Sequence, residues 1–172
     1  MENYPSTREN SRSIIAIGHK AIGPYYWVGH CSDGVDYYAG QTFKSPANGK
    51  LKRIKLFSSI VFGDTDARLT IYEFDQSSHS WKDQKSEVHT HVNKAMEGQW
   101  ISFELPEVDV KNGSHYAFKL SCNHGGMLAI AECPWNVFNP YSDGEEWIGS
   151  SVFTEGHFHK DFDLAFEAEI EA

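Results

Sequence analysis

The chain has 172 residues, a length that one β-sandwich domain can fill with a single core. Its formal net charge of −9 argues against a nucleic-acid partner and against anionic membrane surfaces, because both are bound through Lys and Arg. The apolar run at residues 14–17 is too short for a signal-peptide core or a membrane span, so we expect no membrane insertion.

Alternation of apolar and polar residues predicts strands along almost the whole chain. It is clearest at residues 51–58, where Leu51, Ile54 and Leu56 lie among lysines and an arginine, and it returns at residues 67–75. An aromatic share of 14 % suits strands as well. Ten strands and no helix are predicted. They cover residues 13–17, 35–43, 51–58, 68–74, 86–92, 100–105, 115–122, 127–132, 147–153 and 163–170.

The predicted strands are joined by segments that contain turn residues. Asn, Gly, Pro and Ser punctuate the chain at residues 46–49, 111–114 and 124–126. Many short antiparallel strands with such connections predict an all-β fold, an antiparallel β-sandwich, and we favour a jelly roll. We expect the first strand, at residues 13–17, to pair near the last one, at residues 163–170, because chain ends often lie close together.

No linker divides the chain after its first residues. Residues 1–12 are polar and predict a flexible N-terminal tail, and residues 13–172 predict a single domain.

Five blocks of sequence, taken in order, resemble a known family. In this order they resemble bacterial jelly-roll modules that are similar to galactose-binding-like and carbohydrate-binding domains, and the likeness covers residues 36–170. It implies an accessory or surface unit, secreted or at the cell surface, that often holds a structural calcium ion. It transfers no functional residue. The blocks are QTFKSPANGKLKRIKLF (41–57), RLTIYEFD (68–75), QWISFELPEVDVKNGSHYAFKL (99–120), NPYSDGEEW (139–147) and DLAFEAEI (163–170).

The loop-rich segment at residues 134–147 interleaves aromatic residues with amides and carboxylates. Aromatic faces pack on the apolar faces of sugar rings while the polar groups bind hydroxyls, so this composition favours carbohydrate. The alternative is that the rings pack beneath the loop as part of the core. The candidate ligand-binding residues are Trp135, Asn136, Phe138, Asn139, Tyr141, Asp143 and Trp147, with Trp81 from a separate hairpin.

Two histidine pairs indicate a different chemistry. His89 and His91, and likewise His157 and His159, place two imidazoles on the same side of a strand, an arrangement that can bind a metal ion. The alternative is an exposed strand face. The better cluster combines the second pair with nearby carboxylates, so the candidate metal ligands are His157, His159, Asp161 and Asp163.

Acidic turn residues could supply the oxygen ligands of a structural calcium ion. Such groups are Asp64 with Asp66, Asp143 with Glu145 and Glu146, and Asp161 with Asp163, although turn formation by Asp explains them too. Three cysteines are an odd number, so at most one internal disulfide can form.

The sequence contains no recognisable catalytic signature such as GxSxG or HExxH. It therefore predicts a non-catalytic binding module, with carbohydrate as its ligand. One alternative is a metal-dependent, cupin-like enzyme that uses the histidine pairs. The other is a structural or protein-interaction domain, for which a homo-oligomer is a candidate partner.

Overall fold

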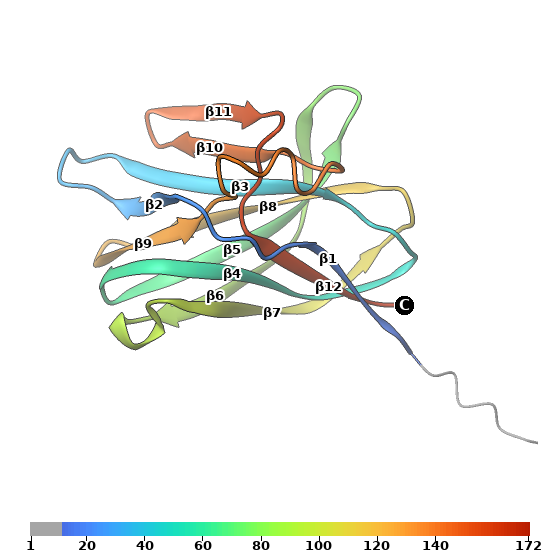
Figure 1. Ribbon diagram of the computed structural model, residues 1–172, viewed down its shortest axis with the longest axis horizontal. Coiled ribbons are helices and arrows are strands. Elements are labelled where there is room, and N and C mark those ends of the chain that lie inside the picture. Colours follow the sequence, from blue (N-terminus) through green and yellow to red (C-terminus); the bar gives the residue numbers. More distant parts are fainter. Residues whose placement is uncertain (1–11) are drawn as a thin grey trace, which may run out of the picture.

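The computed structural model describes residues 12–172 and shows an antiparallel β-sandwich of twelve strands (Figure 1). One short 3₁₀ turn, η1 (Lys94–Met96), precedes β7. The strands are β1 (Ile14–His19), β2 (Tyr25–His30), β3 (Asp36–Lys44), β4 (Gly49–Gly63), β5 (Thr65–Asp75), β6 (Ser80–Val92), β7 (Gln99–Val110), β8 (His115–Cys122), β9 (Gly126–Ala131), β10 (Glu146–Ser150), β11 (Phe153–His159) and β12 (Phe166–Glu171).

The eight strands from β2 to β9 are connected as a jelly roll. One sheet has the order β2-β9-β4-β7 and the other the order β3-β8-β5-β6. Each consecutive pair of strands, β2 and β3, β4 and β5, β6 and β7, β8 and β9, crosses from one sheet to the other, which is the defining connectivity of two Greek keys. The predicted all-β antiparallel sandwich is confirmed.

Four further strands extend this framework, two on each sheet. β12 pairs with β4 beside β9, and β1 pairs with β12 from Ile14 opposite Glu171 to His19 opposite Phe166. The predicted pairing of the first and last strands is confirmed. β10 adds to β3 on the other sheet, and β11 folds back on β10 as a hairpin (Figure 1).

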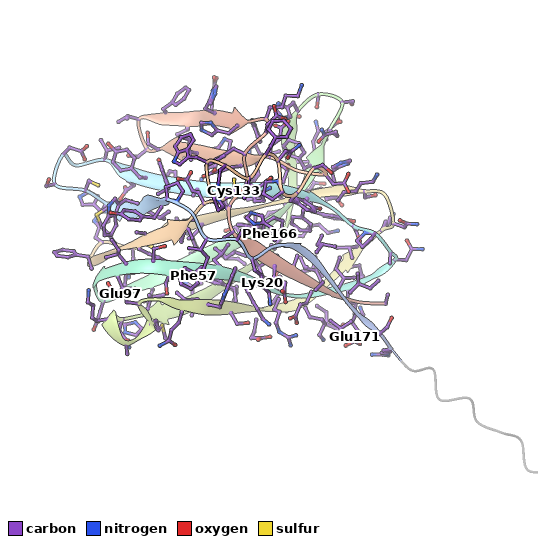
Figure 2. All side chains as sticks on the ribbon, in the orientation of Figure 1. Lys20, Phe57, Glu97, Cys133, Phe166 and Glu171 are labelled. Atoms are coloured by element: carbon purple, nitrogen blue, oxygen red, sulfur yellow. The ribbon has the colours of Figure 1, made fainter. Side chains whose placement is uncertain are left out.

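The core lies between the two sheets and follows the alternation seen in the sequence. In β5, Leu69 and Ile71 are fully buried, whereas Arg68, the residue before Leu69, faces outward. Phe166 of β12, labelled in Figure 2, meets Phe118 of β8 across the interior with ring centroids 5.9 Å apart. Burial of such side chains supplies most of the driving force for folding.

The observed strands differ from the expected ones most clearly in three places. The sequence does not predict β2. The strand expected at residues 147–153 ends at Ser150 instead, and after a two-residue turn at Ser151 and Val152 the chain forms β11, of which the expected strand covers only Phe153. The last strand begins at Phe166 rather than at Asp163. All three cysteines are free thiols, and in the described part of the chain no helix is long and apolar enough to cross a membrane. The expected tail falls almost wholly on residues 1–11, outside the described residues.

Candidate metal centre

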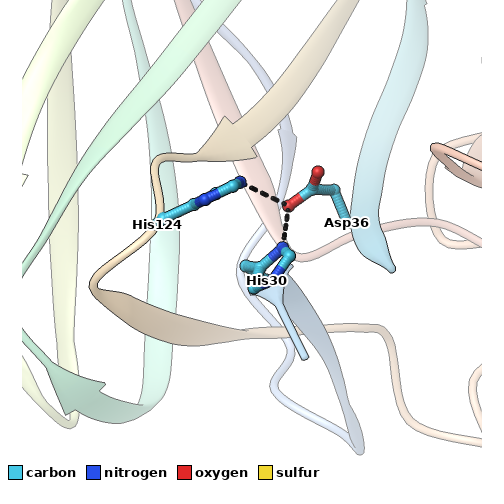
Figure 3. Close-up of side chains that lie close together, drawn as sticks. All are labelled: His30, Asp36 and His124. Carbon is cyan, nitrogen blue, oxygen red and sulfur yellow. Dashed lines mark hydrogen bonds and ion pairs between the residues drawn. The ribbon is translucent and has the colours of Figure 1, made fainter. Parts of the chain in front are cut away.

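Two histidines and one aspartate converge at one end of the jelly roll (Figure 3). His30 is the last residue of β2, Asp36 is the first residue of β3, and His124 lies in the turn between β8 and β9. His30 and Asp36 are directly paired in the β2–β3 ladder, so the corner between the two sheets places their side chains side by side. The chain crosses between the two sheets again from β8 to β9, and the turn at this second crossing brings His124 to the same point.

The three side chains present their ligand atoms to one small volume. Asp36 Oδ1 is 2.8 Å from His30 Nδ1 and 3.5 Å from His124 Nε2, and all three ligand atoms lie within 4.8 Å of one another. The two imidazole rings stack with centroids 4.0 Å apart. An ion with bonds of about 2.1 Å holds its ligand atoms up to about 4.2 Å apart, so small side-chain rotations bring these three into one coordination sphere.

Hydrogen bonds and a close approach of two backbone segments hold the residues of the cluster in place. Asp36 N donates to Ser151 Oγ at 3.0 Å, and Asp33 closes the β2–β3 loop by accepting hydrogen bonds from Val35 N at 2.9 Å and from the Tyr37 hydroxyl at 2.8 Å. Gly29 has φ +136°, and a Cβ there would lie 2.8 Å from the carbonyl oxygen of Gly126. Only glycine therefore lets β2 approach the turn that carries His124.

The cluster forms one wall of a pocket of about 510 Å³. This volume falls within the range of small-molecule sites. The pocket lies on the outer face of the β3-β8-β5-β6 sheet, because Tyr38, Arg68 and Ser121 alternate with buried core residues. The lining residues are Asp36, Tyr38, Asp66, Arg68, His89, Ser121, Cys122, Asn123 and His124.

The structure does not gather the four metal ligands expected from the sequence. The rings of His157 and His159 are adjacent, with centroids 4.9 Å apart. Asp163, however, is fully buried and accepts hydrogen bonds from Gln41 Nε2 at 2.8 Å and from Tyr141 N at 3.1 Å. Asp163 therefore stabilises the interior, and among residues 12–172 the set with Asp161 does not converge as metal ligands do.

The two histidines of the other pair, His89 and His91, contact different carboxylates. His91 Nδ1 lies 3.1 Å from Asp66 Oδ1, whereas His89 Nε2 lies 3.6 Å from Glu87 Oε1. Only His89 of this pair lines the pocket beside the cluster.

The candidate sugar-binding residues divide into an exposed group and a buried group. Trp135 and Phe138 are 84 % and 80 % exposed, and Asn136 and Asp143 are exposed near them in the sequence. Asn139 is half-buried and has φ +42°.

Tyr141 and Trp147 belong to the interior, which corrects their assignment as contact residues. Tyr141 is 9 % exposed, and its hydroxyl accepts a hydrogen bond from Lys44 N at 3.0 Å. Trp147 is 2 % exposed and its Nε1 donates to the Glu155 carbonyl at 3.1 Å. Trp81 is half-buried against Trp147, with ring centroids 5.2 Å apart.

Sequence reasoning missed the cluster because its members are far apart in the chain. His124 follows His30 by more than 90 positions, and the intervening strands hide the relation. A usable signal existed although it was not read as a strand: His30 follows the aromatic and apolar residues 25–28, and His124 precedes a Gly-Gly turn. Only the jelly-roll connectivity shows that these two positions meet.

Comparison with known proteins gives limited guidance. No protein-family model and no curated protein sequence matches the chain. Among solved structures it is similar to a CocE/NonD family hydrolase from Staphylococcus aureus, with 10 % identity, 94 % of this chain and 37 % of that chain covered, and a TM-score of 0.40. The structure of infectious bursal disease virus, Gx strain, gives 9 % identity, coverages of 94 % and 41 %, and a TM-score of 0.36.

A family two carbohydrate esterase from Cellvibrio japonicus gives 11 % identity, coverages of 90 % and 36 %, and a TM-score of 0.20. The chain thus spans well under half the length of each of these three chains. Likenesses this distant carry no argument about what the chain binds.

Proposed function

We propose that this jelly-roll domain binds a divalent transition-metal ion through His30, Asp36 and His124, and through that ion a small ligand in the adjoining pocket. The observation that supports the proposal is the convergence of three ligand atoms within 4.8 Å from two different crossings of the fold. Three protein ligands leave a coordination position open, as in zinc sites that bind an external molecule.

The donor set selects the class of ion. Two imidazole nitrogens and one carboxylate suit zinc, iron, nickel or copper, whereas calcium takes six to eight oxygen ligands. The side chains of His30 and Asp36 are 33 % and 25 % exposed, and that of His124 is 71 % exposed. An ion at this point is therefore supported from inside by β2 and β3 and can be reached from solvent.

The test is a calorimetric titration of untagged, chelator-treated protein with Zn²⁺. We expect one ion per chain, and we expect His124→Ala and Asp36→Asn each to weaken binding by more than about 100-fold, since even the outer partners of metal ligands contribute 10- to 100-fold.

The matched control is His157→Ala, which removes an exposed histidine from β11 and should leave the affinity unchanged. Absence of stoichiometric binding, or equal losses in the control variant, would overturn the metal proposal.

Carbohydrate binding is a second candidate, favoured by the exposure of Trp135 and Phe138. Both rings project from the long loop before β10, and Trp135 is backed by Phe162 with centroids 5.4 Å apart. Exposed rings of this size beside Asn136 and Asp143 match the mixed surface that sugars require. This candidate also agrees with the resemblance to carbohydrate-binding modules.

A glycan-array screen with and without chelator tests the second candidate. We expect a selective signal that Trp135→Ala abolishes while the melting temperature changes by no more than about 2 °C, because an exposed substitution costs little stability. Phe153→Ala removes an exposed ring elsewhere and should keep the signal. A blank array, or a signal indifferent to Trp135, would exclude this loop as a sugar site.

A further inference from the structure

Among the described residues that line the pocket beside the metal cluster, one carries a permanent positive charge, and it is Arg68 of β5. Its Nε lies 3.3 Å from Ser121 Oγ and 3.2 Å from Glu87 Oε1, so the guanidinium is anchored along one edge. Among the described residues no hydrogen bond engages its two terminal nitrogens, and the side chain is 52 % exposed. The free edge of the guanidinium is therefore available to a ligand.

A metal ion would reverse the charge of this pocket. Asp36 and Asp66 of the lining, with Glu87 beside Arg68, contribute three negative charges. Arg68 and the neighbouring Lys119 contribute two positive charges, so the empty pocket and its rim carry one net negative charge when the histidines are neutral. A divalent ion at the cluster changes this to one net positive charge. The loaded pocket would then attract an anion that the empty pocket repels.

Lys119 of β8 adds a second cation to the same outer sheet face. It is paired across the sheet with Thr70, which follows Arg68 by two residues and so lies on the same side. Its Nζ lies 4.3 Å from the centroid of the Tyr38 ring, and Tyr38 lines the pocket. None of the ion pairs formed by residues 12–172 includes Lys119. Positive charge on this sheet face therefore extends from Arg68 in the pocket to Lys119 beside it.

Resting on the metal site proposed above, we propose that the ligand of this pocket is a small oxyanion, a carboxylate or phosphate group, held between the metal ion and the guanidinium of Arg68. Arginine binds such groups through two parallel hydrogen bonds, and the open position of the metal accepts one of the same oxygens. The volume of about 510 Å³ limits the ligand to a small molecule.

The two binding events must be linked. If a bound metal ion strengthens oxyanion binding by some factor, then a bound oxyanion strengthens metal binding by the same factor. We expect this factor to be at least about tenfold, in line with typical couplings between sites.

The experiment titrates Zn²⁺-loaded protein separately with succinate and with inorganic phosphate, and repeats both titrations on chelator-treated protein. We expect binding of at least one of them that disappears without zinc. Stronger binding of succinate would identify a carboxylate ligand, and stronger binding of phosphate would identify a phosphate ligand. Arg68→Gln should weaken oxyanion binding at least tenfold while zinc affinity without oxyanion stays the same.

The matched control is Lys160→Gln, which removes an exposed cation outside this pocket and should change neither affinity. Failure of zinc binding itself would count against the metal site. Zinc binding without any oxyanion response, or an oxyanion response that survives in Arg68→Gln, would overturn only the present inference.

Discussion

Replacing Trp147 by alanine is expected to lower the free energy of unfolding by about 3–5 kcal/mol, the usual cost of removing a large buried aromatic side chain. Trp147 is 2 % exposed, and its ring packs edge-on against Trp81 with centroids 5.2 Å apart. Its Nε1 donates to the Glu155 carbonyl at 3.1 Å, which ties β10 to β11. Removing it leaves a cavity and an unpaired carbonyl in the same place.

Two glycines show how closely the chain surrounds this ring. A Cβ at Gly149 would lie 2.5 Å from the Trp147 ring, and a Cβ at Gly156 would lie 2.3 Å from its Nε1. The backbone therefore lies directly against the indole. The cavity that the substitution leaves can close only if the β10–β11 hairpin moves.

Urea denaturation followed by circular dichroism measures this effect, and Trp135→Ala is the matched control. The control removes the same side chain at a site that is 84 % exposed and should change the free energy of unfolding by less than about 0.5 kcal/mol. A similar small loss for Trp147→Ala would show that its ring is not part of the core.

Raising the pH is expected to destabilise the protein through a buried carboxyl group. Glu146 is fully buried, and neither of its carboxyl oxygens has a hydrogen-bond partner within the described residues. Burial, reinforced by the neighbouring Glu132, raises the pKa of Glu146 well above its ordinary value of 4.5. Burial also raises the pKa of Asp163 to about 6 from 3.8.

Both shifts act in the same direction. The folded state holds these protons more tightly than the unfolded state, so the stabilisation is complete below the ordinary pKa values and is lost as the pH rises through the raised ones. For Asp163 this window runs from 3.8 to about 6, and at about 1.4 kcal/mol per pKa unit it amounts to about 3 kcal/mol. For Glu146 the loss begins at 4.5 and continues to higher pH.

Glu146→Gln isolates the contribution of Glu146, because the amide resembles the protonated carboxyl in shape and cannot ionise. We expect the variant to match the wild type near pH 4 and to exceed its free energy of unfolding by more than about 1 kcal/mol near pH 9. Urea midpoints across this range provide the measurement. Glu107→Gln, at a side chain that is 69 % exposed, should follow the wild-type curve. A Glu146→Gln curve parallel to the wild type would show that Glu146 does not carry this pH dependence.

Local sequence pattern determined much of the fold. The alternation at Leu69 and Ile71 in β5, or at Leu51 and Ile54 in β4, depends only on the two-residue period of a strand, and those residues are fully buried. Turn chemistry at Asn112-Gly113 ends β7 in the same local way. β2 escaped prediction because its rings, in Tyr25, Tyr26 and Trp27, gave no alternation to detect.

Tertiary structure alone decided which candidate residues share a site. Trp135 and Trp147 stand in one loop-rich segment with similar neighbours, yet one is exposed and the other is buried because the β10–β11 hairpin folds over only the second. His30, Asp36 and His124 meet because two crossings of the jelly roll end at the same corner. The sequence by itself determined most of the strands, whose period is local. Burial and convergence depend on contacts between residues far apart in the chain, and no local pattern encodes them.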